Sequence, residues 1–231
     1  AKLMKPYGTL GLAEDTWALN EGVIDEESFL KQAYLYCQER EEMLFKALDR
    51  TPKGVCVCVF DTTDRIQHMF FRCLDDNHPA NKGKETARYK HVIEELYQHM
   101  DGLLGRLIKK MDEKTVLMVI SDHGFTSFRR GVNINTWLLQ NGYLTLKAGK
   151  ITSGKWFADV DWQHTKAYSM GLTGLFINKK GRESQGIVAE GQEYFDLKQE
   201  LMAKLSGLVD NETGEMAIRE IVDAEVMFSG P

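Results

Sequence analysis

Two short apolar runs, joined by a long amphipathic segment, constrain the fold of this chain more than any other feature. The first run covers residues 54–60 (Gly-Val-Cys-Val-Cys-Val-Phe), and the second covers residues 115–120 (Thr-Val-Leu-Met-Val-Ile). Such runs are typical of buried strands, whereas residues 84–112 between them carry apolar side chains at helical spacing. A strand–helix–strand crossover implies two parallel strands with a right-handed connection. The sequence therefore predicts parallel strands on either side of a long helix.

Each apolar run is followed directly by a short signature of acidic and histidine residues. Residues 61–68 (Asp-Thr-Thr-Asp-Arg-Ile-Gln-His) follow the first run, and residues 121–125 (Ser-Asp-His-Gly-Phe) follow the second. Ligands bind at the carboxyl ends of the strands in an open α/β sheet. Carboxylate and imidazole donors suit Zn²⁺ or Mn²⁺. Together the signatures predict a divalent metal site in a metal-dependent hydrolase.

The spacing of the acidic and histidine residues within each signature determines which backbone conformation would let both bind one ion. Asp64 and His68 lie four residues apart, so a helix after the first strand would place both side chains on one face. Asp122 and His123 are adjacent and would point to opposite faces of a regular strand. Their shared use as ligands needs an irregular turn, which Gly124 permits. The alternative is a turn closed by the Asp122 side chain, with His123 exposed.

Composition narrows the range of partners. The 231 residues include 29 basic and 34 acidic side chains, giving a net charge of −5, and no basic cluster marks a nucleic-acid interface. The longest apolar run, residues 55–60, is too short to cross a membrane. With 43% hydrophobic residues the chain can form one domain over residues 1–231. The four cysteines show no disulfide spacing, and free thiols slightly favour the cytoplasm, although the compartment stays unassigned.

The remaining segments alternate between helical and strand-like patterns. A helix is expected from Asp25, where Asp25, Glu26 and Glu27 occupy a favourable first turn. Further along the chain we expect a short helix over residues 134–140, a short strand over 143–147, an irregular stretch over 148–165, a strand pair over 166–170 and 174–178, a helix over 194–208 and a β-like segment over 217–228.

The two signatures resemble those of the type I phosphodiesterase/nucleotide pyrophosphatase family of the alkaline phosphatase superfamily. Three surrounding segments agree with this likeness: residues 12–17 (Leu-Ala-Glu-Asp-Thr-Trp), 165–168 (Thr-Lys-Ala-Tyr) and 174–178 (Gly-Leu-Phe-Ile-Asn). The resemblance therefore covers most of the chain. It implies an alkaline-phosphatase-like α/β fold, with a mostly parallel central sheet flanked by helices. It also implies two divalent metal ions, expected to be Zn²⁺, with Mn²⁺ as the alternative.

The resemblance also implies a role for each member of the signatures. Asp64 and His68 would bind one ion, and Asp122 and His123 the other. Asp61 lies nearer the strand end, where we expect it to orient a ligand or to cap the next helix.

Other elements of the family centre have no match in these 231 residues. The family also uses an Asp and a Thr or Ser nucleophile from an earlier strand and helix, and one later His, and the sequence offers none of the three. We therefore expect an internal portion of a longer protein, incomplete at both ends of the fold and nearly inactive alone.

The activity implied by the resemblance is hydrolysis of phosphodiester or pyrophosphate bonds in a small-molecule substrate, through a covalent phospho-threonine or phospho-serine intermediate. Two alternatives stay open. One is another hydrolase of the superfamily, such as a phosphomonoesterase, sulfatase, phosphonate hydrolase or phosphoglycerate mutase-like enzyme. The other is a catalytically inert binding domain on the same scaffold.

Several further candidates have simpler explanations. Thr62 or Thr63 lies close enough to the proposed ligands to be a nucleophile, but strand-end hydrogen bonding is favoured for both. His164 is a candidate third imidazole, although an exposed loop histidine is favoured. Four arginines near the signatures suit phosphate oxygens, but ordinary surface cations are favoured: Arg65, Arg72, Arg129 and Arg130.

Overall fold

The structure is a computed structural model that describes residues 14–228, so Leu12 and Ala13 of the first family-like segment lie outside it. The chain divides into two compact units between Arg130 and Gly131. It is a mixed helical and stranded protein with small sheets. The prediction of a single domain over residues 1–231 stays a prediction.

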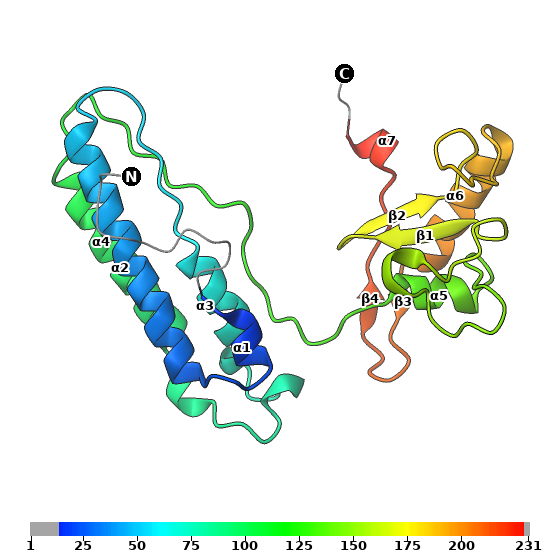
Figure 1. The fold of residues 1–231 in the computed structure, drawn as a ribbon, viewed down its shortest axis with the longest axis horizontal. Coiled ribbons are helices and arrows are strands. Elements are labelled where there is room, and N and C mark those ends of the chain that lie inside the picture. Colours follow the sequence, from blue (N-terminus) through cyan, green and yellow to red (C-terminus); the bar gives the residue numbers. More distant parts are fainter. Residues whose placement is uncertain (1–13, 229–231) are drawn as a thin grey trace. The chain divides into compact units, whose positions relative to one another are not determined.

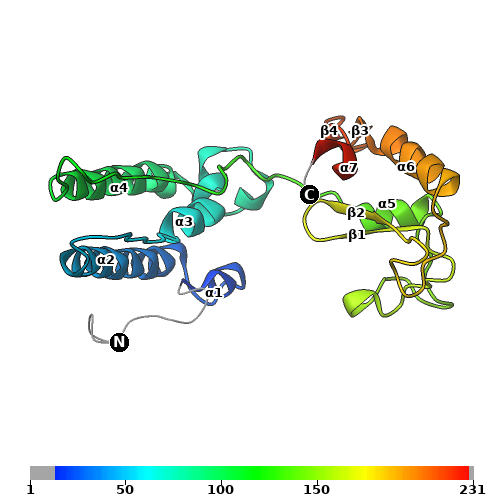
Figure 2. The same cartoon turned by 90° about the horizontal axis from the view of Figure 1, so that it is seen from above.

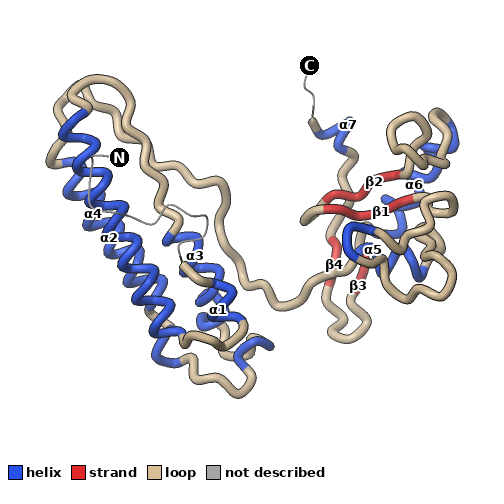
Figure 3. Tube along the Cα trace, viewed as in Figure 1, coloured by secondary structure: helices blue, strands red, loops and turns tan. Residues whose placement is uncertain are grey.

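The first unit is helical (Figures 1 and 3). Its α2 begins where the sequence predicts, because the Asp25 side chain accepts a hydrogen bond from the backbone N–H of Ser28 at 2.8 Å. The helix expected over residues 84–112 is shorter, because its first part forms turns and a 3₁₀ segment. The elements are α1 (Thr16–Asn20), α2 (Glu26–Arg50), α3 (Thr62–Phe70), α4 (Val92–Ile108) and the 3₁₀ segments η1 (Phe71–Leu74), η2 (Pro79–Asn81) and η3 (Ala87–Tyr89).

The two long helices α2 and α4 lie alongside one another and run in the same direction (Figures 1 and 2). Near their starts Arg88 donates to Glu27 at 2.9 Å, and near their ends Lys110 donates to Asp49 at 2.7 Å. Two apolar clusters stabilise this arrangement. One joins α2, α3 and α4 through Phe29, Ala33, Ile66, Phe70, Cys73, Tyr89, Val92, Ile93 and Leu96, and the other joins α2 and α4 through Leu44, Leu103 and Leu107.

The two apolar runs that were predicted to be parallel strands are not strands in the described structure, and a mostly parallel central sheet is not shown. Residues 54–60 nevertheless alternate like a strand. Cys56, Cys58 and Phe60 pack against the Leu44 cluster, whereas the intervening valines at 55, 57 and 59 are 66–86% exposed. Residues 115–120 are exposed throughout. A strand requires a hydrogen-bonded neighbour, and neither run has one among residues 14–228.

The second unit is built around an antiparallel hairpin. Strand β1 (Ala167–Met170) pairs with β2 (Gly174–Ile177), which confirms the predicted strand pair, and Gly171 in the connecting turn has a φ of 75°. The other elements are α5 (Ile134–Gln140), the 3₁₀ segment η4 (Lys155–Phe157), α6 (Gln192–Leu205), the antiparallel pair β3 (Leu208–Val209) and β4 (Met216–Ile218), and α7 (Ala224–Met227).

Helices α5 and α6 confirm the predictions for their segments, and two strand predictions need correction. The segment 143–147 forms only an isolated bridge between Leu146 and Val160. The segment 217–228 is a short strand followed by α7, because Asp223 caps a new helix by accepting from the N–H of Glu225 at 3.0 Å. Among residues 14–228 no helix combines the length and apolar character needed to span a membrane.

Candidate metal centre

The first signature covers most of α3, from the N-cap residue Asp61 to His68 in the last turn. As the sequence predicts, the chain turns into a helix after Phe60, and the Oδ1 atom of Asp64 lies 3.2 Å from the Nε2 atom of His68 one turn later. The opposite face of α3 is fixed by Ile66 and Phe70, both fully buried. The helix therefore presents the carboxylate and the imidazole together on its outer face.

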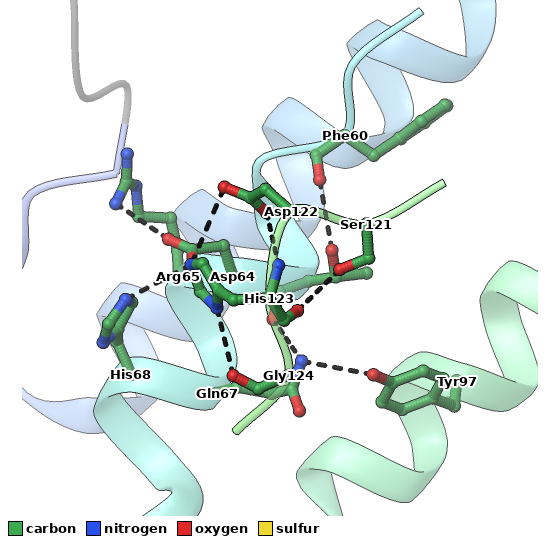
Figure 4. A network of polar contacts seen from close by, with 11 residues as sticks. Phe60, Asp64, Arg65, Gln67, His68, Tyr97, Ser121, Asp122, His123 and Gly124 are labelled. Carbon is green, nitrogen blue, oxygen red and sulfur yellow. Dashed lines mark hydrogen bonds and ion pairs between the residues drawn. The ribbon is translucent and has the colours of Figure 1, made fainter. Parts of the chain in front are cut away.

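The second signature lies beside the first (Figure 4). The Nε2 atom of His123 is 3.5 Å from Oδ1 of Asp64 and 3.8 Å from Oδ2 of Asp122. Two hydrogen bonds hold the irregular backbone that neighbouring ligands require. The Ser121 hydroxyl donates to the carbonyl of His123 at 2.6 Å, and the His123 N–H donates to Oδ1 of Asp122 at 3.1 Å. Segments far apart in the sequence thus meet around Asp64.

The orientation of His123 decides which of its nitrogens faces the carboxylates. Its Nδ1 lies 3.0 Å from the carbonyl oxygen of Gly124. Because a carbonyl only accepts hydrogen bonds, this contact places a proton on Nδ1, so that in a neutral ring the lone pair of Nε2 would face Asp64. A lone pair facing a carboxylate oxygen is repulsive unless a proton or a cation lies between them.

Neighbouring side chains orient the acidic and imidazole groups. Arg65 pairs with Oδ2 of Asp64 at 3.0 Å, which leaves Oδ1 facing the two histidines. The ring of Phe125 contacts His68 and His123 edge-on, at centroid distances of 4.9 and 5.2 Å. Both imidazoles are half-exposed, so an ion or a substrate reaches them from solvent.

These residues fit divalent ions by donor type, and two pairs of their donor atoms have the spacing of neighbouring ligands. A tetrahedral ion with bonds of about 2.0–2.1 Å places neighbouring donor atoms about 3.3–3.4 Å apart. Oδ1 of Asp64 lies 3.2 Å from Nε2 of His68 and 3.5 Å from Nε2 of His123, and each separation suits two ligands of one ion. The three atoms do not all lie within 4.8 Å of one another, so the structure does not gather them around a single ion. The side chain of Asp122 is 90% exposed, and its Oδ2 lies 3.8 Å from Nε2 of His123.

The remaining residues of the first signature occupy supporting positions. Asp61 stands at the N-cap position of α3, but its side chain makes no capping hydrogen bond and instead lies 3.9 Å from Arg40. Thr62 is buried and donates to Glu14 at 3.4 Å, where burial raises the pKa of the Glu14 carboxyl. Thr63 donates to the carbonyl of Phe60 at 3.2 Å, which is the strand-end hydrogen bonding favoured from sequence. Neither hydroxyl is presented to the ligands.

The other sequence candidates are engaged elsewhere. Arg72 donates to Glu26 at 2.9 Å, and Arg129 lies 3.2 Å from Asp75, so both bind carboxylates of the protein. His164 belongs to the second unit, where its Nδ1 contacts Asp161 at 2.8 Å.

One cluster of possible ligands was not predicted from sequence. Cys37 and Glu41 on α2 lie close to His99 on α4, with one donor atom of each within 4.8 Å of the others. The local signal is the four-residue spacing of Cys37 and Glu41, which places both on one face of α2. The approach of His99 depends on how α4 packs against α2, so the spacing of residues in the sequence does not predict it.

A comparison with protein families identifies the chain. The family model described as type I phosphodiesterase / nucleotide pyrophosphatase matches residues 13–229, nearly the whole sequence. The chain belongs to this family. No curated protein and no solved structure gives a significant match. Membership of the type I phosphodiesterase/nucleotide pyrophosphatase family supports a phosphoester hydrolase at the family level and confirms the resemblance carried by the two signatures.

Proposed function

We propose that this chain carries the metal-binding part of a phosphodiesterase or pyrophosphatase centre that acts on small-molecule phosphoesters. Asp64 and His68 would hold one divalent ion and Asp122 and His123 the second, with Zn²⁺ the expected metal and Mn²⁺ the alternative. The observation that carries the proposal is the meeting of the two signatures, with Nε2 of His68 at 3.2 Å and Nε2 of His123 at 3.5 Å from Oδ1 of Asp64.

The bound ions would supply Lewis-acid polarisation of the phosphate and lower the pKa of the attacking group. The residues of this chain hold and orient the donors. Arg65 holds one oxygen of Asp64, so the other stays directed at the imidazoles. The carbonyl of Gly124 fixes the tautomer of His123, a supporting contact of the kind that strengthens metal binding.

The proposal assigns no nucleophile among the described residues. Thr62 and Thr63 both direct their hydroxyls to other protein groups. The Thr or Ser nucleophile and the third histidine implied by the resemblance are therefore proposed to lie outside this chain. Hydrolysis of bis(p-nitrophenyl) phosphate by the chain alone is expected to be negligible, and a robust rate would contradict this part of the proposal.

Metal binding by calorimetry tests the centre directly. Mn²⁺ is the sharper probe because it prefers oxygen and nitrogen donors, and Zn²⁺ is titrated in parallel. The Asp64→Asn/Asp122→Asn variant keeps the shape of both side chains but removes their charge, and we expect it to lose Mn²⁺ binding. Asp101→Asn, an exposed acid on α4, is the matched control and should bind as the wild type does. Equal Mn²⁺ affinity in the wild type and the double variant would refute the proposed ligands.

A further inference from the structure

A second group of donor atoms lies between the long helices of the first unit. Cys37 and Glu41 stand one turn apart on α2, and His99 faces them from α4. Cys37 is fully buried and Glu41 is nearly so, whereas the His99 side chain is 39% exposed. The group is therefore closed on the α2 side and open to solvent at the imidazole.

The two oxygens of Glu41 have different partners. Oε1 contacts the Nε2 atom of His99, and Oε2 accepts from the guanidinium of Arg106. Arg106 thus holds one oxygen and leaves the other in the group with Cys37 and His99. Carboxylates that bind metals are commonly oriented in this way, with one oxygen hydrogen-bonded to a neighbouring donor and the other free to bind the ion.

We propose that Cys37, Glu41 and His99 form a zinc site that joins α2 to α4. A thiolate, a carboxylate and an imidazole are the donors that Zn²⁺ takes in proteins, and three such ligands leave a fourth tetrahedral position for water. The thiolate and the carboxylate together offset the charge of the ion. None of these three residues belongs to the two signatures or to the ligands predicted from them. The site is therefore additional to the proposed centre at Asp64 and His123.

Binding requires one movement and one proton transfer. The contact between Glu41 and His99 must open to the separation of two zinc ligands, about 3.3 Å. His99 is the exposed member, and its only ring contact within the described residues is the edge-on packing of Tyr34 at 6.2 Å. The Cys37 proton passes to solvent as the sulfur–metal bond forms, so the affinity rises with pH.

The local environment keeps the thiol protonated until a metal arrives. Burial raises the pKa of Cys37 to about 11, and the nearby carboxylate of Glu41 adds to this effect. The nearby hydroxyl of Thr62, at the start of α3, lowers the pKa of the thiol by a smaller amount.

Cobalt substitution tests the site, because Co²⁺ bound by a thiolate shows a sulfur-to-metal charge-transfer absorption that oxygen and nitrogen ligands do not produce. The full chain is titrated with Co²⁺ alone and then with Zn²⁺, which should displace it and remove the absorption. None of the ligands proposed at the Asp64 centre is a sulfur. The absorption therefore reports on Cys37 even if the proposed function is wrong, and it should persist in Asp64→Asn/Asp122→Asn.

Two variants and two controls decide the assignment. Cys37→Ala should abolish the absorption, and His99→Gln, a change at a partly exposed position, should weaken Co²⁺ binding at least about tenfold. Cys73→Ala, at a second buried cysteine, and His91→Gln, at an exposed histidine before α4, should leave binding unchanged.

Three results would overturn the proposal, with far-ultraviolet circular dichroism used to confirm that each variant is folded. The first is no charge-transfer absorption from the folded wild type, which would leave Glu41, His99 and Arg106 as an ion-pair network only. The second is an absorption that survives Cys37→Ala. The third is wild-type affinity in His99→Gln.

Discussion

Asn178, at the end of β2, gives the sharpest test of what holds the second unit together. Its side chain is fully buried, and its Nδ2 atom donates to three backbone carbonyls. These belong to Trp162 at 3.0 Å, Thr165 at 2.8 Å and Gln185 at 3.2 Å. One amide group therefore ties the loop before β1 to the loop after β2. Replacing it with alanine removes every one of these contacts.

The expected cost follows from the number of hydrogens available. An amide NH₂ has two hydrogens, so the three carbonyls share two full hydrogen bonds. A net hydrogen bond contributes about 1 kcal/mol, and a buried acceptor left unsatisfied costs about 1–3 kcal/mol. We expect Asn178→Ala to lower the free energy of unfolding by about 2–4 kcal/mol.

Asn178→Asp should destabilise the unit in a pH-dependent way, because a carboxylate would face three carbonyl oxygens without a donor. Burial and these oxygens would raise the pKa of the new acid above its unfolded value of about 3.9. The penalty is therefore smallest below about pH 4 and grows as the pH rises to the folded-state pKa.

Urea unfolding followed by tryptophan fluorescence measures these effects, since Trp137, Trp156 and Trp162 all belong to the second unit. Asn141→Ala is the matched control. Asn141 also donates to a backbone carbonyl, that of Trp137 at 2.8 Å, but it is exposed, so a change within about 0.5 kcal/mol is expected. The reasoning fails if Asn178→Ala costs no more than this control, or if the Asn178→Asp penalty does not change with pH.

Three further outcomes are expected from the packing and the ionisation of the two units. Leu103→Ala, at a buried position between α2 and α4, should cost about 2–5 kcal/mol in urea unfolding, whereas Ile108→Ala at a largely exposed position should cost far less. Because Cys37 is fully buried and burial raises its pKa to about 11, its thiol should react with a disulfide reagent at pH 8 only as fast as the protein unfolds, and mass spectrometry after timed quenching would detect earlier modification. Hydrogen bonding to Lys198 lowers the pKa of Asp223, so the stability from this pair is present above the ordinary aspartate pKa and is lost as the pH falls through the folded-state pKa. Asp223→Asn should reduce the acid sensitivity of unfolding, and an unchanged pH profile would argue against the pair.

Helical periodicity was sufficient to predict much of the local structure. Apolar spacing located α2, α4, α5 and α6, although α4 is shorter than predicted because turns replace its first part. The hairpin of β1 and β2 was predictable since its strands are neighbours and Gly171 supplies the turn. The four-residue spacing of Asp64 and His68 became a contact once α3 formed. Each of these features depends on residues within a few positions of one another.

The two predicted parallel strands could not be confirmed from local patterns alone. Residues 54–60 keep the alternation of a strand, with Cys56 and Cys58 turned toward the helices, but form no ladder. A strand is completed by hydrogen bonds from a neighbour that can lie anywhere in the sequence. The pattern of the run itself carries no information on whether that neighbour is present.

The sequence by itself determined the helices α2, α5 and α6, the hairpin of β1 and β2, and the family. The tertiary structure alone decided which distant groups meet. His99 reaches Cys37 and Glu41 because the burial of apolar faces sets where α2 and α4 pack. His123 reaches Asp64 where Phe125 contacts the rings of His68 and Phe71. Contacts within a helix follow from its 3.6-residue period, whereas contacts between segments follow from the packing of the whole unit.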